Sequence, residues 1–267
     1  MLDLLQVVLP VFLIVGAGYW AVSQGAFTED GSEALMIFAQ RFAIPCLLFL
    51  AMSRLELATL FDWRLLLSFF AGTVSCFAFS ALMAHYFFHR TPPEAVTVGF
   101  SATFANAVLL GIPIIERAFG EDALAANFTI IAFHAPVCYT LGIAVMESVL
   151  ATGKSKVETA TTIFRSIFSN PLMIGIVLGV IVNISGFTLP AFIGDPIEFV
   201  SEAAIGVALF ALGGILSKYK LSDRWSEITM VTTLRLFWHP LLAFTLSFWV
   251  FQLPIDIVRG VVITASM

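Results

Sequence analysis

Long apolar runs follow one another along the whole chain, each close to the length of about 20 residues that a helix needs to cross a bilayer. The hydrocarbon core cannot hydrate an open backbone, and the runs lack the alternation of barrel strands, so we predict helices. A ninth span begins near Ile255. The preceding predicted spans are 4–23, 33–53, 64–88, 95–119, 128–150, 168–186, 197–217 and 230–251.

The composition decides which class of protein these runs build. The 267-residue chain is 60% hydrophobic and 12% charged, with a mean hydropathy of +0.99, whereas a soluble domain carries about a quarter charged residues. Polar residues are too few to cover a soluble globule, so we predict an all-α integral membrane protein. No basic tract indicates a nucleic-acid partner, and no Cys or His spacing indicates a metal or another cofactor.

The longest polar connection, residues 151–167, is predicted to be a cytoplasmic loop between a first repeat at 1–150 and a second, incomplete repeat at 168–267. With the N-terminus outside, seven Lys and Arg residues fall on the cytoplasmic side and four fall outside, as the positive-inside rule requires. The cytoplasmic set is Arg90, Lys154, Lys156, Arg165, Lys218, Lys220 and Arg224, and the outer set is Arg54, Arg64, Arg117 and Arg259.

Prolines and glycines recur when the chain is displaced along itself by 161 positions. The matched pairs, which include one aspartate and one threonine pair, are Pro10 and Pro171, Gly18 and Gly179, Asp62 and Asp223, Pro93 and Pro254, Gly99 and Gly260, and Thr103 and Thr264. Five spans per half is an odd number, so the halves would form the inverted five-plus-five repeat of many secondary transporters. The offset places Met267 opposite Asn106. We therefore expect a C-terminally truncated chain without the counterparts of residues 107–150, and a natural nine-span protein is the alternative.

The fourth span is interrupted at residues 104–120, FANAVLLGIPIIERAFG. Pro113 lacks the N–H that would bond four residues back, and Gly111 loosens the same turn. We predict a break between Asn106 and Pro113, because the N-terminus of a second half-helix offers N–H groups and partial positive charge to an anion. A simple proline kink is the alternative, and the repeat favours the break. Two hydroxyl residues extend the candidate substrate site: Ser101 and Thr103.

This segment carries a resemblance to a known family. Residues 105–125, ANAVLLGIPIIERAFGEDALA, place an Asn before a Gly-x-Pro and then a Phe-Gly, and this pattern resembles the crossover of the auxin efflux carrier family, which includes bacterial malate and malonate permeases. RFAIPCLLF (41–49) resembles the family's second span, and RGVVITASM (259–267) resembles the start of its ninth. One departure is Gly206, where the seventh span of the family often has a proline.

The resemblance implies ten helices in two inverted repeats, with the fourth and ninth helices crossing as broken helices at the substrate site. It also implies a scaffold made of spans 1, 2, 6 and 7, a transport domain made of the others, and a homodimer in the bacterial cytoplasmic (inner) membrane.

Charged residues inside a span are candidates for function. Arg41, in the second span, either balances an anionic substrate or snorkels to the interface. Arg235 opens the eighth span and is predicted to snorkel there. His134, in the fifth span, either carries a proton coupled to transport or is a hydrogen-bonded structural residue. His239 is predicted to be a packing residue.

Three functions compete for this sequence. The first is a secondary active or potential-driven carrier of a small mono- or dicarboxylate such as malate, malonate or an auxin-like acid, moved by alternating access. A sodium-coupled carrier of the bile-acid type would need acidic ligands beside Asn106, and the sequence has none there. A membrane-embedded enzyme would need a catalytic pair at depth, and the chain has no HExxH motif. We predict a carrier rather than an enzyme.

Overall fold

The computed structural model describes residues 2–54, 62–150, 155–219 and 224–267, and every secondary-structure element in these ranges is helical. Among them, four continuous helical stretches are long and apolar enough to cross a membrane: Glu29–Arg54, Trp63–Tyr86, Leu124–Leu150 and Ala191–Leu216. Two shorter apolar helices are Val8–Ser23 and Pro171–Ser185. The chain is therefore an integral membrane protein with an all-helical fold, as the sequence predicts. Lys154, Lys220 and residues 151–154 of the predicted loop lie outside the described residues.

The polar residues between the apolar runs set where several helices begin. Asp62 precedes the third span and its carboxylate accepts a hydrogen bond from the Arg64 amide at 2.9 Å. The Arg64 guanidinium binds the same carboxylate and holds the pKa of Asp62 below its usual range. Thr91 and Glu94 form a capping box around a proline start, and Asn170 caps a helix that begins at a proline. These are the residues that favour helix N-termini, because they satisfy amides with no partner inside the helix.

The chain divides into two compact units, and each is made of segments from both halves of the sequence. Unit 1 comprises Met1–Glu56, Ile112–Gly120 and Ser169–Leu221, which are spans 1, 2, 6 and 7 with the second part of span 4. These four spans are the ones that the family resemblance assigns to a scaffold. The helices of unit 1 are α1 (Leu2–Ser23), α2 (Glu29–Phe38), α3 (Ile44–Arg54), α7 (Ile112–Phe119), α10 (Pro171–Ser185) and α11 (Ala191–Leu216). A π-helical turn, Ala39–Ala43, joins α2 to α3.

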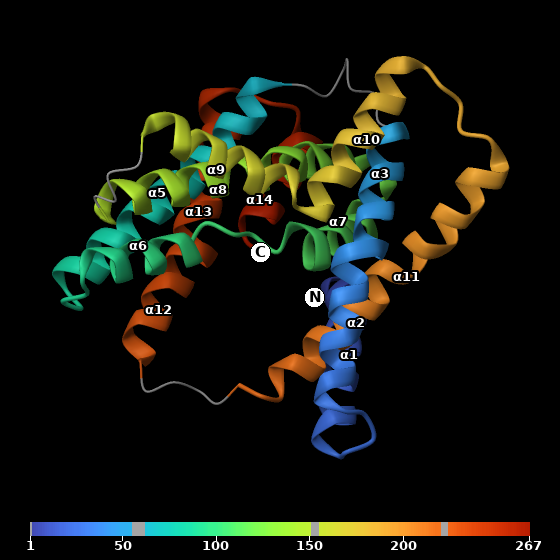
Figure 1. The fold of residues 1–267 in the computed structure, drawn as a ribbon, viewed down its shortest axis with the longest axis horizontal. Coiled ribbons are helices and arrows are strands. Elements are labelled where there is room, and N and C mark those ends of the chain that lie inside the picture. The colour runs from blue at the N-terminus through green and yellow to red at the C-terminus, as the bar shows by residue number, and fades with distance from the viewer. Residues whose placement is uncertain (1, 55–61, 151–154, 220–223) are drawn as a thin grey trace. The chain divides into compact units, whose positions relative to one another are not determined.

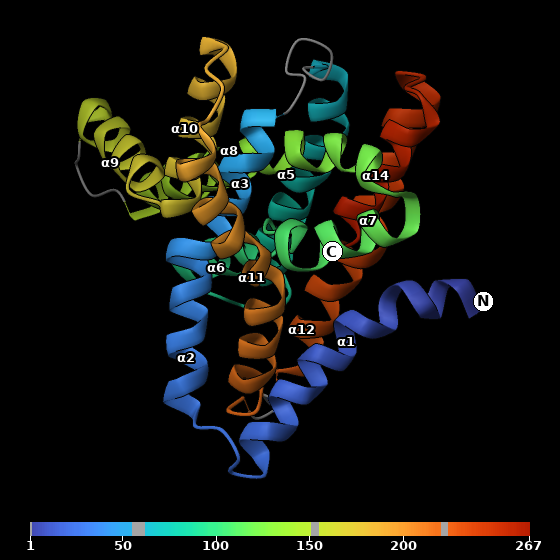
Figure 2. The ribbon, with the colours of Figure 1, turned by 90° about the vertical axis from the view of Figure 1, so that its right-hand side faces the viewer.

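Glycine lets two helix pairs of unit 1 approach closely. In both ribbon views α3 runs beside α10, and α1 packs on α11 (Figures 1 and 2). A Cβ atom on Gly18 of α1 would lie 2.0 Å from the carbonyl oxygen of Phe210 in α11. A Cβ atom on Gly179 of α10 would lie 2.4 Å from the carbonyl oxygen of Phe49 in α3. Membrane helices pack through small residues in this way because apolar burial does not drive them together within lipid.

These two contacts are related by the displacement found in the sequence. Residues 18 and 179 differ by 161 positions, and so do residues 49 and 210, so the α1–α11 contact recurs as the α10–α3 contact. A second pair of contacts obeys the same rule. Val22 lies against Gly214. The equivalent positions are Asn183 and Ser53, and the Asn183 side-chain amide donates a hydrogen bond to the Ser53 carbonyl at 3.0 Å. In each pair of contacts, the residue from the first repeat in one contact is replaced by its equivalent from the second repeat in the other. An inverted repeat requires this relation.

Unit 2 contains the remaining spans. Its helices are α5 (Trp63–Tyr86), α6 (Pro92–Ser101), α8 (Leu124–Leu150), α9 (Lys156–Phe168), α12 (Trp225–Thr233), α13 (His239–Phe244) and α14 (Ile255–Ala265). Three π-helical turns complete it: Ala107–Gly111, Leu234–Trp238 and Thr245–Val250. The segment from α12 to Val250 is continuously helical and corresponds to the predicted eighth span. A 3₁₀ turn at Glu121–Ala123 leads into α8.

The predicted connection between the two repeats contains a helix. Residues 151–167 were predicted to be a cytoplasmic loop, and Lys156–Phe168 form the helix α9. That this connection is cytoplasmic stays a prediction. Ser155 starts α9, because its hydroxyl accepts from the Glu158 amide at 3.1 Å and the Glu158 carboxylate accepts from the Ser155 amide. This reciprocal cap stabilises the start of a helix in a polar stretch, where low hydrophobicity does not indicate one.

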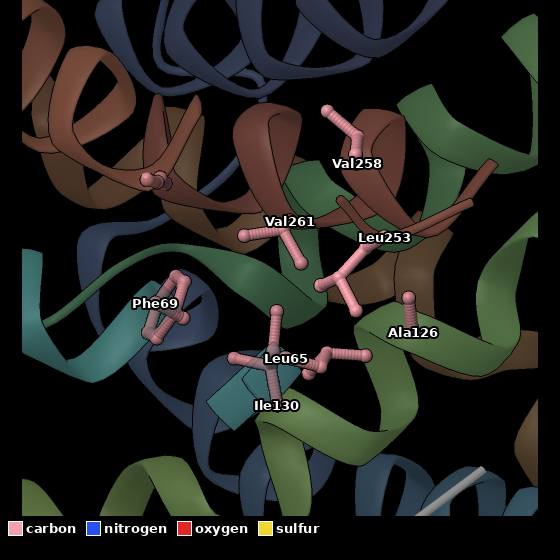
Figure 3. Close-up of a cluster of buried hydrophobic side chains, with 9 residues drawn as sticks. Leu65, Phe69, Ala126, Ile130, Leu253, Val258 and Val261 are labelled. Atoms are coloured by element: carbon pink, nitrogen blue, oxygen red, sulfur yellow. The ribbon is translucent and has the colours of Figure 1, made fainter. Parts of the chain in front are cut away.

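The core of unit 2 lies where α5, α8 and α14 meet. Figure 3 shows side chains from these helices and from the segment before α14 turned toward a common centre. The buried set comprises Leu65, Phe69, Ala126, Ile130, Ala243, Leu253, Val258, Val261 and Ala265. This core fixes the helices that surround the break in the fourth span.

The close glycine contact in α1 gives a direct test of unit 1. Gly18→Ala should destabilise the protein by about 1–3 kcal/mol, because the added methyl group would overlap the Phe210 carbonyl. Gly16→Ala is the matched control in the same helix, since a Cβ there meets nothing within 4 Å. The measurement is the unfolding temperature of the purified variants in detergent. Equal unfolding temperatures for the two variants would contradict the packing.

Candidate functional site

The fourth span is broken, but at an earlier point than the sequence predicts. Helix α6 ends at Ser101, two turn residues follow, and Phe104–Asn106 have no helical structure. The chain becomes helical again at Ala107 and continues through Pro113, which lies inside α7. The prediction of a break between Asn106 and Pro113 is therefore wrong in position. The break lies at residues 102–106 because the partners that satisfy the freed amides are found there. The helix can continue through Pro113, which has no N–H to donate, because a wide π turn precedes it.

Asn106 starts the second half-helix as its N-cap. The side-chain oxygen accepts from the Leu109 amide at 3.2 Å, and the backbone carbonyl accepts from Leu110 and Gly111 at 3.1 and 3.0 Å. Among the described residues, no acceptor is found for the amides of Ala107 and Val108. A capped helix start with free amides is partially positive and suits an anion.

His134 of α8 holds the non-helical segment in place. Its Nε2 accepts a hydrogen bond from the Ala105 amide at 3.1 Å, and the side chain is only 7% exposed. The ring packs edge-on against Phe104 and Phe69. Nε2 cannot bind a proton while it accepts this bond, so proton uptake there would release Ala105. The structure thus gives His134 the hydrogen-bonded structural role, and proton coupling stays a prediction.

Asn127, also in α8, lies between the half-helix start and the end of α14. Its side-chain nitrogen donates to the Thr264 hydroxyl at 2.9 Å, and a Cβ on Gly111 would lie 3.1 Å from the same nitrogen. Gly111 therefore makes room for this amide as well as loosening its own turn. The Asn127 side-chain oxygen is buried and has no hydrogen-bond partner among the described residues, and a buried unpaired acceptor is uncommon enough to indicate function.

The two predicted hydroxyl residues use their donors within their own helix. Ser101 is exposed and donates to the Val98 carbonyl at 2.7 Å. Thr103 is fully buried and donates to the Phe100 carbonyl at 2.7 Å. Their contact with a substrate stays a prediction.

The other two predicted site residues, Arg41 and Pro113, belong to unit 1. Arg41 is exposed on the π turn between α2 and α3 and lines a groove of about 550 Å³ that is otherwise apolar. The groove is also lined by Phe42, Pro45, Cys46, Phe49, Pro171, Ile174, Gly175, Leu178 and Ile197. That Arg41 and Pro113 share a site with Asn106 stays a prediction.

Comparison with known proteins identifies the family of this chain. The family described as "Membrane transport protein" matches residues 3–267, which is almost the entire sequence. The chain belongs to this family, the auxin efflux carrier family. Auxin efflux carrier proteins are membrane transporters, so this chain is a membrane-embedded transporter of a small-molecule substrate.

Relatives of this auxin efflux carrier family protein include bacterial transporters. The "Uncharacterized transporter YfdV" of Escherichia coli (strain K12) is 28% identical over 87% of this chain and 74% of its own length. The "Putative malonate transporter" of Rhizobium meliloti (strain 1021) is 25% identical over 91% of this chain and 76% of its own length. The "Lysosomal cholesterol signaling protein" of Mus musculus is 25% identical over 90% of this chain but only 29% of its own length.

Sequence reasoning missed one residue beside the break, Asn127, and misjudged the burial of another residue of unit 2, Arg235. Asn127 lies just before the predicted start of the fifth span, so an amide inside the membrane went unnoticed; the signal was its place one helical turn into an apolar helix, α8. Arg235 was expected to snorkel, and that prediction is wrong, because it is only 7% exposed. The helix turns its guanidinium inward toward His239 of α13 rather than to the interface.

The bond between His134 and the break can be tested directly. His134→Phe keeps the ring but removes the acceptor, so it should cost about 1–3 kcal/mol of stability and speed hydrogen exchange at the Ala105 amide. His134→Gln is the matched variant, because its amide oxygen can still accept. The measurement is hydrogen exchange at the Ala105 amide in both purified variants in detergent. Unchanged exchange at Ala105 in the Phe variant would show that His134 does not hold the break.

Proposed function

We propose that the protein is a secondary carrier of a small organic anion, a mono- or dicarboxylate of the malonate or malate type, which it moves by alternating access. The anion would rest at the start of the second half-helix, on the Asn106 side-chain amide and the amides of Ala107 and Val108. The observation that carries the proposal is this capped helix start with free amides inside a transporter's apolar span. The relative named as a malonate transporter supports the substrate class.

The chemistry of Asn106 suits such a site. Its side-chain oxygen accepts a hydrogen bond from the Leu109 amide, so the side-chain nitrogen is the group that remains to bind a ligand. No hydrogen-bond partner of that nitrogen is found among the described residues. A carboxylate accepts hydrogen bonds only, so it pairs with this donor and with the backbone amides.

The remaining features belong to the same proposal. The charge count of the loops supports an N-terminus outside the bacterial cytoplasmic membrane. The family resemblance supports a homodimer, with unit 1 as the scaffold and unit 2 as the moving domain. Transport would then be driven by the membrane potential or by a coupled ion.

Two substitutions at Asn106 separate the cap from the substrate contact. Asp caps helices as well as Asn, so Asn106→Asp should fold normally. Its charge would repel the anion, and two unit charges about 4 Å apart cost about 4 kcal/mol at an effective dielectric of 20, so uptake should fall more than tenfold. Asn106→Ala should lose transport and about 1 kcal/mol of stability. The measurement is uptake of labelled malonate, malate and succinate into proteoliposomes containing the purified protein.

Thr97→Ala is the matched control, because Thr97 is exposed on α6 and bonds only the Pro93 carbonyl in its own helix. Wild-type uptake by the folded Asp variant would show that the anion does not bind at Asn106. Uptake that stops without sodium would instead favour the sodium-coupled carrier. Failure of the parent to move any carboxylate would remove the anion from the proposal.

A further inference from the structure

Arg235 is a charged side chain enclosed within unit 2. It lies on the π turn Leu234–Trp238 of the eighth span and is 7% exposed. Among the Lys, Arg, Asp and Glu residues whose side chains the structure describes, it is the only buried one. An enclosed charge in a membrane protein is costly and generally has a function.

The hydrogen bonds of Arg235 hold the guanidinium but do not neutralise it. Nη1 donates to Nδ1 of His239 at 2.6 Å, and Nε2 of His239 lies 3.0 Å from the Phe69 carbonyl. These two bonds fit a neutral imidazole with its proton on Nε2. Nη2 donates to the main-chain oxygen of Met267 at 3.2 Å. A guanidinium has five N–H donors, so three donors remain, and no acceptor for them is found among the described residues.

No Asp or Glu side chain of the described residues pairs with Arg235. The ion pairs of unit 2 lie elsewhere: Arg64 binds Asp62, Arg90 binds Glu227, and Arg259 binds Asp256. A buried cation without an anionic partner is strongly unfavourable. A bound anion would remove that cost at the moment of binding, so the uncompensated charge favours anion binding at this place.

Arg235 is connected to both ends of the candidate crossover. The Met267 oxygen that it contacts follows α14 and lies 161 positions after Asn106, so it is the equivalent position of the second repeat. Thr264 in the last turn of α14 bonds Asn127, and Asn127 adjoins Gly111 of the half-helix start. On the other side, the partner of Arg235, His239, bonds the Phe69 carbonyl, and the Phe69 ring packs against His134, which holds Ala105.

We propose that Arg235 is the positive group that binds one ionised carboxylate of the transported anion. This inference rests on the proposed function and names the residue that provides its charge selectivity. Arg235 fits the carboxylate better than a lysine would, because its planar fork can bind two oxygens at once. The site then requires at least one ionised carboxylate, and a neutral isostere of the same size is excluded.

The test is equilibrium binding to the purified protein, measured by titration calorimetry in detergent. The probes are malonate and its neutral diamide, malonamide. The parent should bind malonate and not malonamide. Arg235→Gln should raise the Kd for malonate at least about tenfold, since a lost charge-assisted pair in a buried site costs about 1.4 kcal/mol or more. Arg165→Gln, at an exposed arginine of α9 outside the candidate site, is the matched control and should bind as the parent does.

Arg235→Lys keeps the charge without the fork, and its Kd should rise about threefold or more but less than that of the Gln variant. If the size-exclusion profile and circular dichroism show that Arg235→Gln is not folded, the Kd of the Lys variant tests the inference instead. A folded Gln variant or a Lys variant with the parent's Kd would overturn the inference and leave Arg235 as a brace for α14. A parent that binds malonamide as tightly as malonate would also overturn it. A parent that binds no carboxylate would overturn the proposed function together with the inference.

Discussion

A backbone that leaves its helix within a membrane must find protein partners for its amides and carbonyls, because lipid offers none. The structure meets this demand at residues 102–106 with short turn bonds after α6, the His134 acceptor and the Asn106 cap. Other features of unit 2 follow from it. Helix α8 carries both His134 and Asn127, and Gly111 has no side chain where Asn127 approaches. The core shared by α5, α8 and α14 fixes α8 in the register that these contacts need.

Much of the architecture could be predicted from the sequence. Span length identifies the helices, and matched glycines reveal the repeat, because a glycine at a close helix contact cannot be replaced without overlap. Gly18 and Gly179 show this: the sequence pairs them by position, and the structure places them against Phe210 and Phe49, which are paired in the same way. The caps at Asp62, Thr91 and Asn170 are equally local signals.

The details of the site could not be predicted in the same way, because they depend on partners distant in sequence. Pro113 marks a disturbed helix but does not say where the freed amides will be satisfied, and the acceptor for Ala105 is on another helix. Arg41 and Arg235 look alike in the sequence, as single cations within apolar runs. Packing alone separates them, since Arg41 is exposed beside an apolar groove and Arg235 is enclosed beside His239.

The central claim is that the fourth span is broken so that its second half-helix can receive a carboxylate. The most direct measurement is a cryo-EM or crystallographic map of the protein in lipid with saturating malonate. The account predicts a non-helical chain at residues 104–106 and ligand density within hydrogen-bond distance of the Asn106 side-chain nitrogen. A continuous helix through residues 102–106, or malonate bound away from Asn106, would contradict it.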